Sequence, residues 1–117
     1  MESEKDGKAK QAEELPACPV ETTLTLISDK WKVLIFRDLM PGTKRFGELK
    51  KSIGHVSQKV LTAQLRQMEA SGLLTRTVFP EVPPHVEYTL TELGYSLKPI
   101  LDAMRDWGEN YKARNGQ

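Results

Sequence analysis

The stretch VSQKVLTAQLRQMEASGLLTR, residues 56–76, has the spacing of a helix with an unusual outward face. Leu61, Leu65 and Met68 follow the i, i+4, i+7 repeat of a buried helical stripe, and Ser57 precedes them as the expected N-cap. The opposite face lacks the long acid and base pairs that usually solubilise an exposed helix. That face carries Lys59, Thr62, Ala63, Arg66 and Ala70. Either it contacts a partner surface, or its alanines serve only as good helix formers on a lightly packed surface.

Three further helices are predicted on the N-terminal side of this stretch. Pro19 suits the first position of a helix whose apolar residues repeat at helical spacing. Asp29 is expected to cap a second helix over residues 30–40, with apolar residues gathered on one face. Pro41-Gly42 ends that helix, and FGELKKSIG predicts a short third helix that closes at Gly54.

The hydrophobic pattern changes period after this stretch. Residues 73–79 are rich in β-branched side chains, and residues 86–90 alternate, with Val86, Tyr88 and Leu90 on the inward face. The segment PEVPP lies between them. We therefore predict a two-stranded hairpin with a stiffened tip.

A long closing helix is predicted to follow the hairpin, with Thr91 as its N-cap. Pro99 should kink this helix, because a proline inside a helix removes a hydrogen bond and clashes with the preceding turn. Its apolar positions, three and four residues apart, are Leu93, Leu97, Ile100, Leu101, Met104, Trp107 and Tyr111.

Length and composition indicate one folded domain. The chain has 117 residues, of which 38% are hydrophobic, which suits a soluble domain with a modest core. We predict a disordered arm over residues 1–15, the folded domain over residues 16–113 and a flexible tail over residues 114–117. No stretch approaches the roughly 18 consecutive apolar residues of a membrane span. The charged start MESEKDGKAKQAEEL lacks the apolar core of a signal peptide, so we expect a cytoplasmic protein without membrane contact.

Positive charge is concentrated in the middle of the chain. Residues 30–76 contain ten Lys and Arg residues against three Asp and Glu residues, although the whole chain carries a net charge of only +1. The segments before and after are both net acidic. A face that binds a polyanion would need this distribution of charge. A run of charged side chains that simply face solvent is the commoner cause of such clusters.

The order of predicted elements is helix, helix, short helix, helix, hairpin, helix. This is the order of a winged helix-turn-helix domain, a mainly α fold with a small β-hairpin wing. The second helix of such a motif lies in the DNA major groove and reads bases from its N-terminal turns. Here Lys59 and Arg66 would meet phosphate or guanine, Gln58 would pair with adenine, and Thr62 or Ala63 would contact a thymine methyl group.

These residues resemble the HxlR-type transcriptional regulators, a family of bacterial winged-helix proteins. The resemblance runs through CPVE, DKWKVLIFRDL, GTKRFGELKKSI, VSQKVLTAQLRQMEASGLL, FPEVPPHVEYTLTELG and DAMRDWG. It implies a homodimeric DNA-binding regulator, a repressor or activator of a nearby operon, with the hairpin as the wing. The expected DNA-contact residues are Lys44, Arg45, Ser57, Gln58, Lys59, Thr62, Ala63, Arg66, Arg76 and His85.

The wing departs from the family pattern at one position. Such proteins often carry Arg or Lys before the VEY stretch, and this chain has His85. Contact between the wing and a phosphate is therefore expected to be weaker, or pH-dependent. The alternative for His85 is a solvated strand residue without a role in binding.

The resemblance also implies that the first and last helices build the dimer. The closing helix carries more apolar surface than one small domain is expected to cover, so we predict a twofold dimer on an inverted-repeat operator. The expected dimer residues are Val20, Leu24, Ile27, Leu97, Ile100, Leu101, Met104 and Trp107.

Cys18, the single cysteine, is a candidate redox sensor. In several HxlR-type proteins the cysteine of the CPVE motif senses oxidants or electrophiles. Cys18 lies next to the start of the first helix, whose positive end favours the thiolate, while Glu21 opposes that effect. A lone cysteine in a twofold dimer pairs only with the partner's copy or with a small thiol. The alternative is a small buried packing residue.

Two rival classes of function are an enzyme and a winged-helix module for protein association alone. Neither His55 nor His85 is placed by the predicted elements to act as a base toward Cys18, which argues against a thiol-dependent enzyme. The sequence has no metal-ligand spacing, no glycine-rich phosphate loop and no paired carboxylate motif, so we expect no cofactor or metal. No residue pattern identifies a small-molecule effector.

Overall fold

The computed structural model describes residues 15–116, which form helices around a small antiparallel sheet. The helices are α2 (Pro19–Ile27), α3 (Lys30–Leu39), α4 (Phe46–Ile53), α5 (Gln58–Ala70), α6 (Glu92–Tyr95) and α7 (Lys98–Arg114). The strands are β1 (Lys44–Arg45), β2 (Leu74–Phe79) and β3 (His85–Leu90). This architecture confirms the predicted winged helix-turn-helix fold. The predicted arm over residues 1–15 lies, except for Leu15, outside the described residues, as does Gln117.

Three helices begin at the polar caps that the sequence predicted. The Asp29 carboxylate accepts a hydrogen bond of 2.7 Å from the backbone N–H of Trp31. The Ser57 hydroxyl accepts from Val60 at 3.1 Å, and the Thr91 hydroxyl accepts from Gly94 at 3.1 Å. Each such cap contributes about 1 kcal/mol by satisfying a backbone donor that has no partner within its helix.

The hydrophobic core is built around α3. Ile35, Phe36 and Leu39 on one face of this helix are completely buried. Against them pack the predicted inward stripe of α5 and the inward residues of β2 and β3. These are Leu61, Leu65, Met68, Leu74, Tyr88 and Leu90. The period of 3.6 in α5 and of 2 in β3 therefore indicated their buried faces correctly.

The sheet has three strands in the order β1-β3-β2, one more than the sequence predicted. β2 and β3 pair antiparallel from Leu74 opposite Leu90 to Phe79 opposite His85. β1 consists of only two residues, Lys44 and Arg45, which lie opposite Tyr88 and Glu87. A strand of two residues cannot show an alternating pattern, so the sequence did not predict β1.

The predicted single closing helix is wrong, because the chain forms two helices there. α6 ends at Tyr95, and α7 begins at Lys98 after a turn at Ser96 and Leu97. Pro99 lies in the first turn of α7, where its missing N–H would have no partner within the helix. Pro99 therefore helps to begin a helix and does not kink one.

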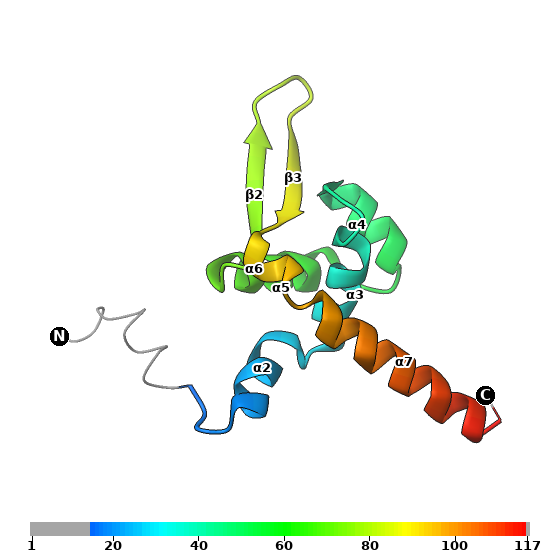
Figure 1. The fold of residues 1–117 in the computed structure, drawn as a ribbon. Helices are drawn as coiled ribbons and strands as arrows, with labels where there is room; N and C mark the ends of the chain where they lie inside the picture. The colour runs from blue at the N-terminus through cyan, green and yellow to red at the C-terminus, as the bar shows by residue number, and fades with distance from the viewer. Residues whose placement is uncertain (1–14, 117) are drawn as a thin grey trace.

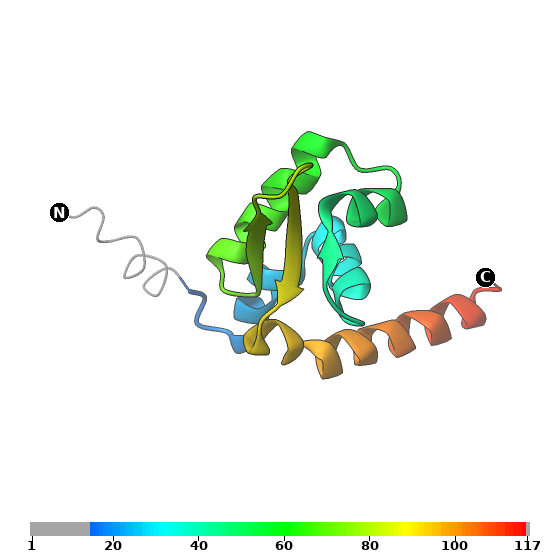
Figure 2. The same ribbon diagram turned by 90° about the horizontal axis from the view of Figure 1, so that it is seen from above.

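The wing and α7 project from the helical body in different directions. Figure 1 shows β2 and β3 standing away from the helices, while α7 leaves the body and carries the C-terminal end outward. Figure 2 shows α7 running along one edge of the body. Within residues 15–116, the helices are all too short or too polar to cross a membrane.

Gly94 provides a test of the packing between α6 and the start of the hairpin. A Cβ atom at this buried glycine would overlap the backbone carbonyl oxygen of Leu73, which accepts the backbone N–H of Thr91. We predict that Gly94→Ala lowers the free energy of unfolding by about 1–3 kcal/mol, because the backbone must shift to admit the methyl group. Urea denaturation followed by circular dichroism measures the change.

Gly108→Ala is the matched control, because a Cβ atom there meets open space within α7. This substitution should leave stability unchanged or raise it by up to about 1 kcal/mol, as alanine is the better helix former. Equal stability of the Gly94→Ala variant and the wild type would show that α6 is not packed as described.

Candidate nucleic-acid interface

The outward face of α5 is exposed, as the sequence predicted. Ser57, at the helix N-cap, opens this face, and five exposed side chains follow along α5: Gln58, Lys59, Ala63, Arg66 and Ala70. Thr62, also on this face, is half-buried. α4, the turn over residues 54–57 and α5 together form the helix-turn-helix. Gly54 has a φ of 90° at the start of that turn, a conformation that favours glycine.

Two side-chain hydrogen bonds fix the orientation of α5 on α3. The Gln64 amide donates from Nε2 to Asp29 Oδ2 at 3.1 Å, and Lys32 Nζ donates to Gln67 Oε1 at 2.8 Å. Together with the buried leucines of α5, these bonds set which residues of the helix face outward. The sequence did not predict these two hydrogen bonds, because each joins residues 35 positions apart.

A slot of about 190 Å³ separates α5 from the wing. Gln58, Thr62 and Arg66 line it from the helix side, and Arg76 lines it from β2. Tyr88 and Val86 of β3, with Phe46 and Glu69, complete the lining. The fold thus brings Arg76 beside the outward residues of α5, as expected for a wing that supports the recognition helix.

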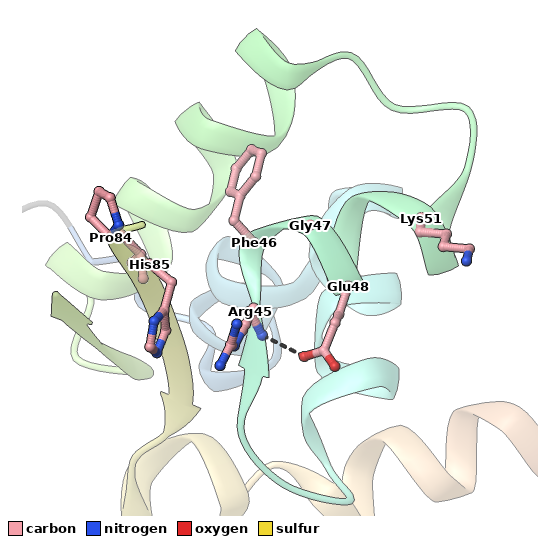
Figure 3. Close-up of a pocket in the computed structure, with 8 residues that line it drawn as sticks. Arg45, Phe46, Gly47, Glu48, Lys51, Pro84 and His85 are labelled. Carbon is pink, nitrogen blue, oxygen red and sulfur yellow. Dashed lines mark hydrogen bonds between the residues drawn. The ribbon is translucent and has the colours of Figure 1, made fainter. Parts of the chain in front are cut away.

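A second cavity of about 580 Å³ lies where the first turn of α4 meets the start of β3. Figure 3 shows the Phe46 ring directed toward α5 and the Arg45 and His85 side chains on neighbouring strands. The backbone N–H of Arg45 donates to the Glu48 carboxylate at 2.8 Å, which anchors the start of α4. Lys51 also lines this cavity. Lys51 was absent from the predicted contact set, although it belongs to the basic middle of the chain.

Carboxylates lie near the cations of this surface without pairing with them: Glu69 lines the slot with Arg66 and Arg76, and Glu48 lines the second cavity with Arg45. Lys44, Arg45, Lys59, Arg66 and Arg76 form no ion pair with any carboxylate of residues 15–116. Lys44 is half-buried on β1, and the other four are exposed.

His85 is largely covered within the wing. Its ring stacks on Phe79 with centroids 4.6 Å apart, and its side chain is only 15% exposed. Nδ1 lies 3.5 Å from Glu81, and Nε2 lies 3.1 Å from Glu87. The interpretation as a solvated residue is wrong because Phe79 covers the ring. A carboxylate also lies beside each ring nitrogen of His85.

The expected dimer residues divide into exposed and buried groups. Val20 is 67% exposed and Trp107 68% exposed, and the other exposed residues of the set are Leu24, Ile100 and Met104. Tyr111 extends this surface, because its ring stacks on Trp107 at a centroid distance of 5.3 Å. The prediction fails for Ile27 and Leu97, which are 3% and 7% exposed and belong to the core of the chain itself. Leu101 is half-buried and packs against that core.

Cys18 is exposed at the N-cap of α2 and forms no disulfide. Its backbone carbonyl accepts the N–H of Thr22 at 3.1 Å, and its side chain makes no capping hydrogen bond. The interpretation of Cys18 as a buried packing residue is therefore wrong for this conformation. Within residues 15–116, no three His, Cys, Asp or Glu side chains gather in a way that could hold a metal ion.

Comparison with known proteins identifies the class to which this fold and surface belong. The family model described as HxlR-like helix-turn-helix matches residues 26–116. The HTH-type transcriptional regulator YdeP of Bacillus subtilis is 45% identical over 114 residues, which cover 97% of this chain and 89% of YdeP.

Solved structures agree with this match. The redox regulator HypR in its reduced form superposes with a TM-score of 0.79 and 44% identity, over 86% of this chain and 100% of that chain. The reduced form of the transcriptional regulator YodB from B. subtilis has a TM-score of 0.72 and 37% identity, over 82% of this chain and 95% of that chain.

The fold and the outward face of α5 define a DNA-binding transcriptional regulator of the helix-turn-helix type. This chain belongs to the HxlR-like helix-turn-helix family. The resemblance seen in the sequence is thereby confirmed, and the enzyme alternative is set aside, because the relatives are named as transcriptional regulators.

Proposed function

We propose that this protein binds a specific inverted-repeat DNA operator as a homodimer and regulates transcription of a nearby operon. The observation that carries the proposal is the exposed face of α5 beside Arg76, with cations that form no ion pair with a carboxylate of residues 15–116. A DNA duplex offers partners for this surface: a regular array of phosphates for the cations, and base edges that side chains can recognise.

The residues of this face divide by chemistry into readers of bases and binders of phosphate. Gln58 stands in the first turn of α5 and carries the amide that pairs bidentately with adenine. Thr62 and Ala63, one turn further on, offer methyl groups to thymine. Lys59 and Arg66 contact phosphate or guanine, while Arg76, Lys44 and Arg45 bind the backbone on either side of the groove.

The salt dependence of binding tests the phosphate contacts. We predict that affinity for a fragment spanning the promoter beside the protein's own gene falls steeply with salt. Arg66→Gln should reduce the slope of log affinity against log salt by about one per protomer, because each lost phosphate contact releases one counterion fewer. Fluorescence anisotropy at several salt concentrations measures the slope.

Two variants serve as controls for that measurement. Lys112→Gln removes a charge from the last turn of α7, away from α5, and should leave the slope unchanged. Gln58→Ala should also leave the slope unchanged but relax the preference at one base pair, at a cost of about 1–3 kcal/mol. A flat salt dependence in the wild type would reject DNA binding through this face and favour a module for protein association.

The dimer is proposed from the apolar surface that the folded chain leaves exposed. α7 presents Ile100, Met104 and Trp107 to solvent, and α2 presents Val20 and Leu24. Large apolar side chains gathered on two helices indicate an interface with another molecule. Twofold pairing of such a surface would place the two copies of α5 in successive major grooves, about 34–36 Å apart.

Sedimentation of the protein at micromolar concentration tests this assembly. We predict a dimer for the wild type and at least tenfold weaker association for Trp107→Ala, because the indole is a large apolar group whose burial would contribute strongly to the interface. Val78→Ala, which truncates an exposed apolar side chain on the wing, is the control and should associate like the wild type. A monomeric wild type that sediments like Trp107→Ala would contradict the proposal.

Cys18 adds a second proposal, that of thiol-redox control of DNA binding. The supporting observations are the exposed thiol at the start of α2 and the likeness to HypR, which is named as a redox regulator. In the proposed reaction, the thiolate attacks the O–O bond of a peroxide to give a sulfenic acid and water after proton transfer. A second thiol, either the partner's Cys18 or a small thiol, then displaces water from the sulfenic sulfur and forms a disulfide.

Operator binding before and after treatment with peroxide tests the redox proposal. We predict that oxidation changes the affinity of the wild type, because α2 carries part of the proposed dimer surface, and that Cys18→Ser does not respond. Non-reducing gels would detect a disulfide-linked dimer, and mass spectrometry a mixed disulfide. Identical responses of wild type and Cys18→Ser to the oxidant would exclude Cys18 as the sensor.

A further inference from the structure

A groove of about 600 Å³ runs between α3 and the first half of α7. Its walls are mostly aliphatic and thioether side chains, contributed by Val33, Leu34, Met40, Leu101 and Met104. The groove remains open because none of the residues of α7 is fully buried, and only Leu101 among them packs against the core. Its volume lies within the range of about 300–1,000 Å³ that is typical of small-molecule sites.

This groove and the proposed dimer surface lie on different faces of α7. Ile100, Met104 and Trp107 are four and three residues apart, so they follow one line along the helix. The groove is lined from α7 mainly by Lys98, Leu101, Asp102 and Arg105. At 3.6 residues per turn, the centres of these two faces are about 120° apart around the helix axis, and only Met104 borders both. A partner copy on the first face would therefore leave the second accessible.

Four charged residues line the groove: Arg37, Lys98, Asp102 and Arg105. Asp102 accepts from Lys98 at 2.7 Å through one oxygen and from Arg105 at 3.4 Å through the other. The hydrogen bond from Lys98 holds the pKa of the Asp102 carboxyl below its usual range, and the charges of Lys98 and Arg105 act in the same direction. Asp102 is therefore charged, and each of its oxygens accepts one hydrogen bond from a cation of its own helix.

Arg37 lines the groove from α3 and has unused hydrogen-bond donors. Its Nε donates to Asp38 at 2.9 Å, while its two terminal nitrogens have no acceptor among residues 15–116. A guanidinium edge above an apolar groove matches a carboxylate attached to an apolar body, because Arg binds carboxylates with two parallel hydrogen bonds.

We propose that the groove between α3 and α7 is an effector site for an organic carboxylate with an apolar body. The apolar part would lie between Leu34, Met40 and Leu101, and the carboxylate would accept hydrogen bonds from the terminal nitrogens of Arg37. The two methionines can adjust to ligands of different shape, since their side chains are unbranched and flexible.

Occupation of this groove would act on DNA binding through α3, a step that rests on the proposed function. Asp29 and Lys32 of α3 hold α5 by the hydrogen bonds to Gln64 and Gln67. α7 carries the proposed dimer surface. A ligand between α3 and α7 would therefore change how the recognition helix is placed relative to the dimer axis, and this placement determines the operator spacing that the dimer fits.

Titration of the full-length protein with 2-naphthoate, without DNA, tests the site directly. Amide chemical shifts should change in α3 and the first half of α7 and not in the wing. Arg37→Gln should lower the affinity for 2-naphthoate about tenfold, because it removes the charged donor, and leave the affinity for the neutral analogue 2-naphthylmethanol within twofold. Arg114→Gln, a loss of charge at the far end of α7, should change neither affinity.

A second variant keeps the test independent of charge. Val33→Phe enlarges a half-buried side chain in the groove wall and should weaken binding of both the acid and the alcohol. The proposal is overturned if no shifts appear in α3 and α7 at millimolar 2-naphthoate, or if acid and alcohol bind equally well to the wild type. It is also overturned if sedimentation shows that 2-naphthoate binds only when the dimer dissociates. In that case a second copy of the chain would occupy the groove in the dimer.

A final comparison separates this site from the proposed function. If 2-naphthoate binds as described and shifts operator affinity in the wild type but not in Arg37→Gln, both proposals are supported. Binding without DNA by a protein that fails to bind the promoter fragment supports the site and rejects the proposed operator function. Operator binding without binding of 2-naphthoate rejects the site alone.

Discussion

The proposed DNA-binding surface depends on how α5 is held against α3, and a single carboxylate has a central part in this contact. One oxygen of Asp29 caps α3 by accepting the N–H of Trp31, and the other accepts the side-chain amide of Gln64 on α5. The buried stripe of α5 packs on the same helix. Because a helix rotated by one residue would present a different face, this fixation decides which residues α5 offers to a partner.

The arrangement of charge follows from the same framework. Helices α4 and α5 and strand β2 bring cations to one side of the molecule, although the chain as a whole is close to neutral. The wing tip has the opposite character, because Glu81 and Glu87 surround His85. Attraction to DNA would therefore be strongest at α5 and its neighbours and weaker at the tip of the wing.

α7 has a different structural role from the other helices. It contributes little to the core and projects from the body, which leaves one of its faces exposed for the proposed dimer and another bordering the groove beside α3. α3 contacts both the recognition helix and this groove. A family member built in this way can connect events at its outer helix to the DNA-binding face through one central helix, without a separate ligand-binding domain.

Local sequence patterns were sufficient to predict the helices of the core, their polar caps, the hairpin and the inward faces of α5 and β3. These features depend on local spacing and on single capping residues such as Ser57, which act over a few positions of the chain. The folded chain was needed to show the pairing of β1 with β3, the burial of Ile27 and Leu97 and the stacking of Phe79 on His85, because these features depend on packing between elements. The break before Pro99 is local, but the spacing of apolar residues continues across it and so did not show it. A local pattern shows that a residue is apolar and on which face it lies, but not whether that face meets the chain's own core or another molecule.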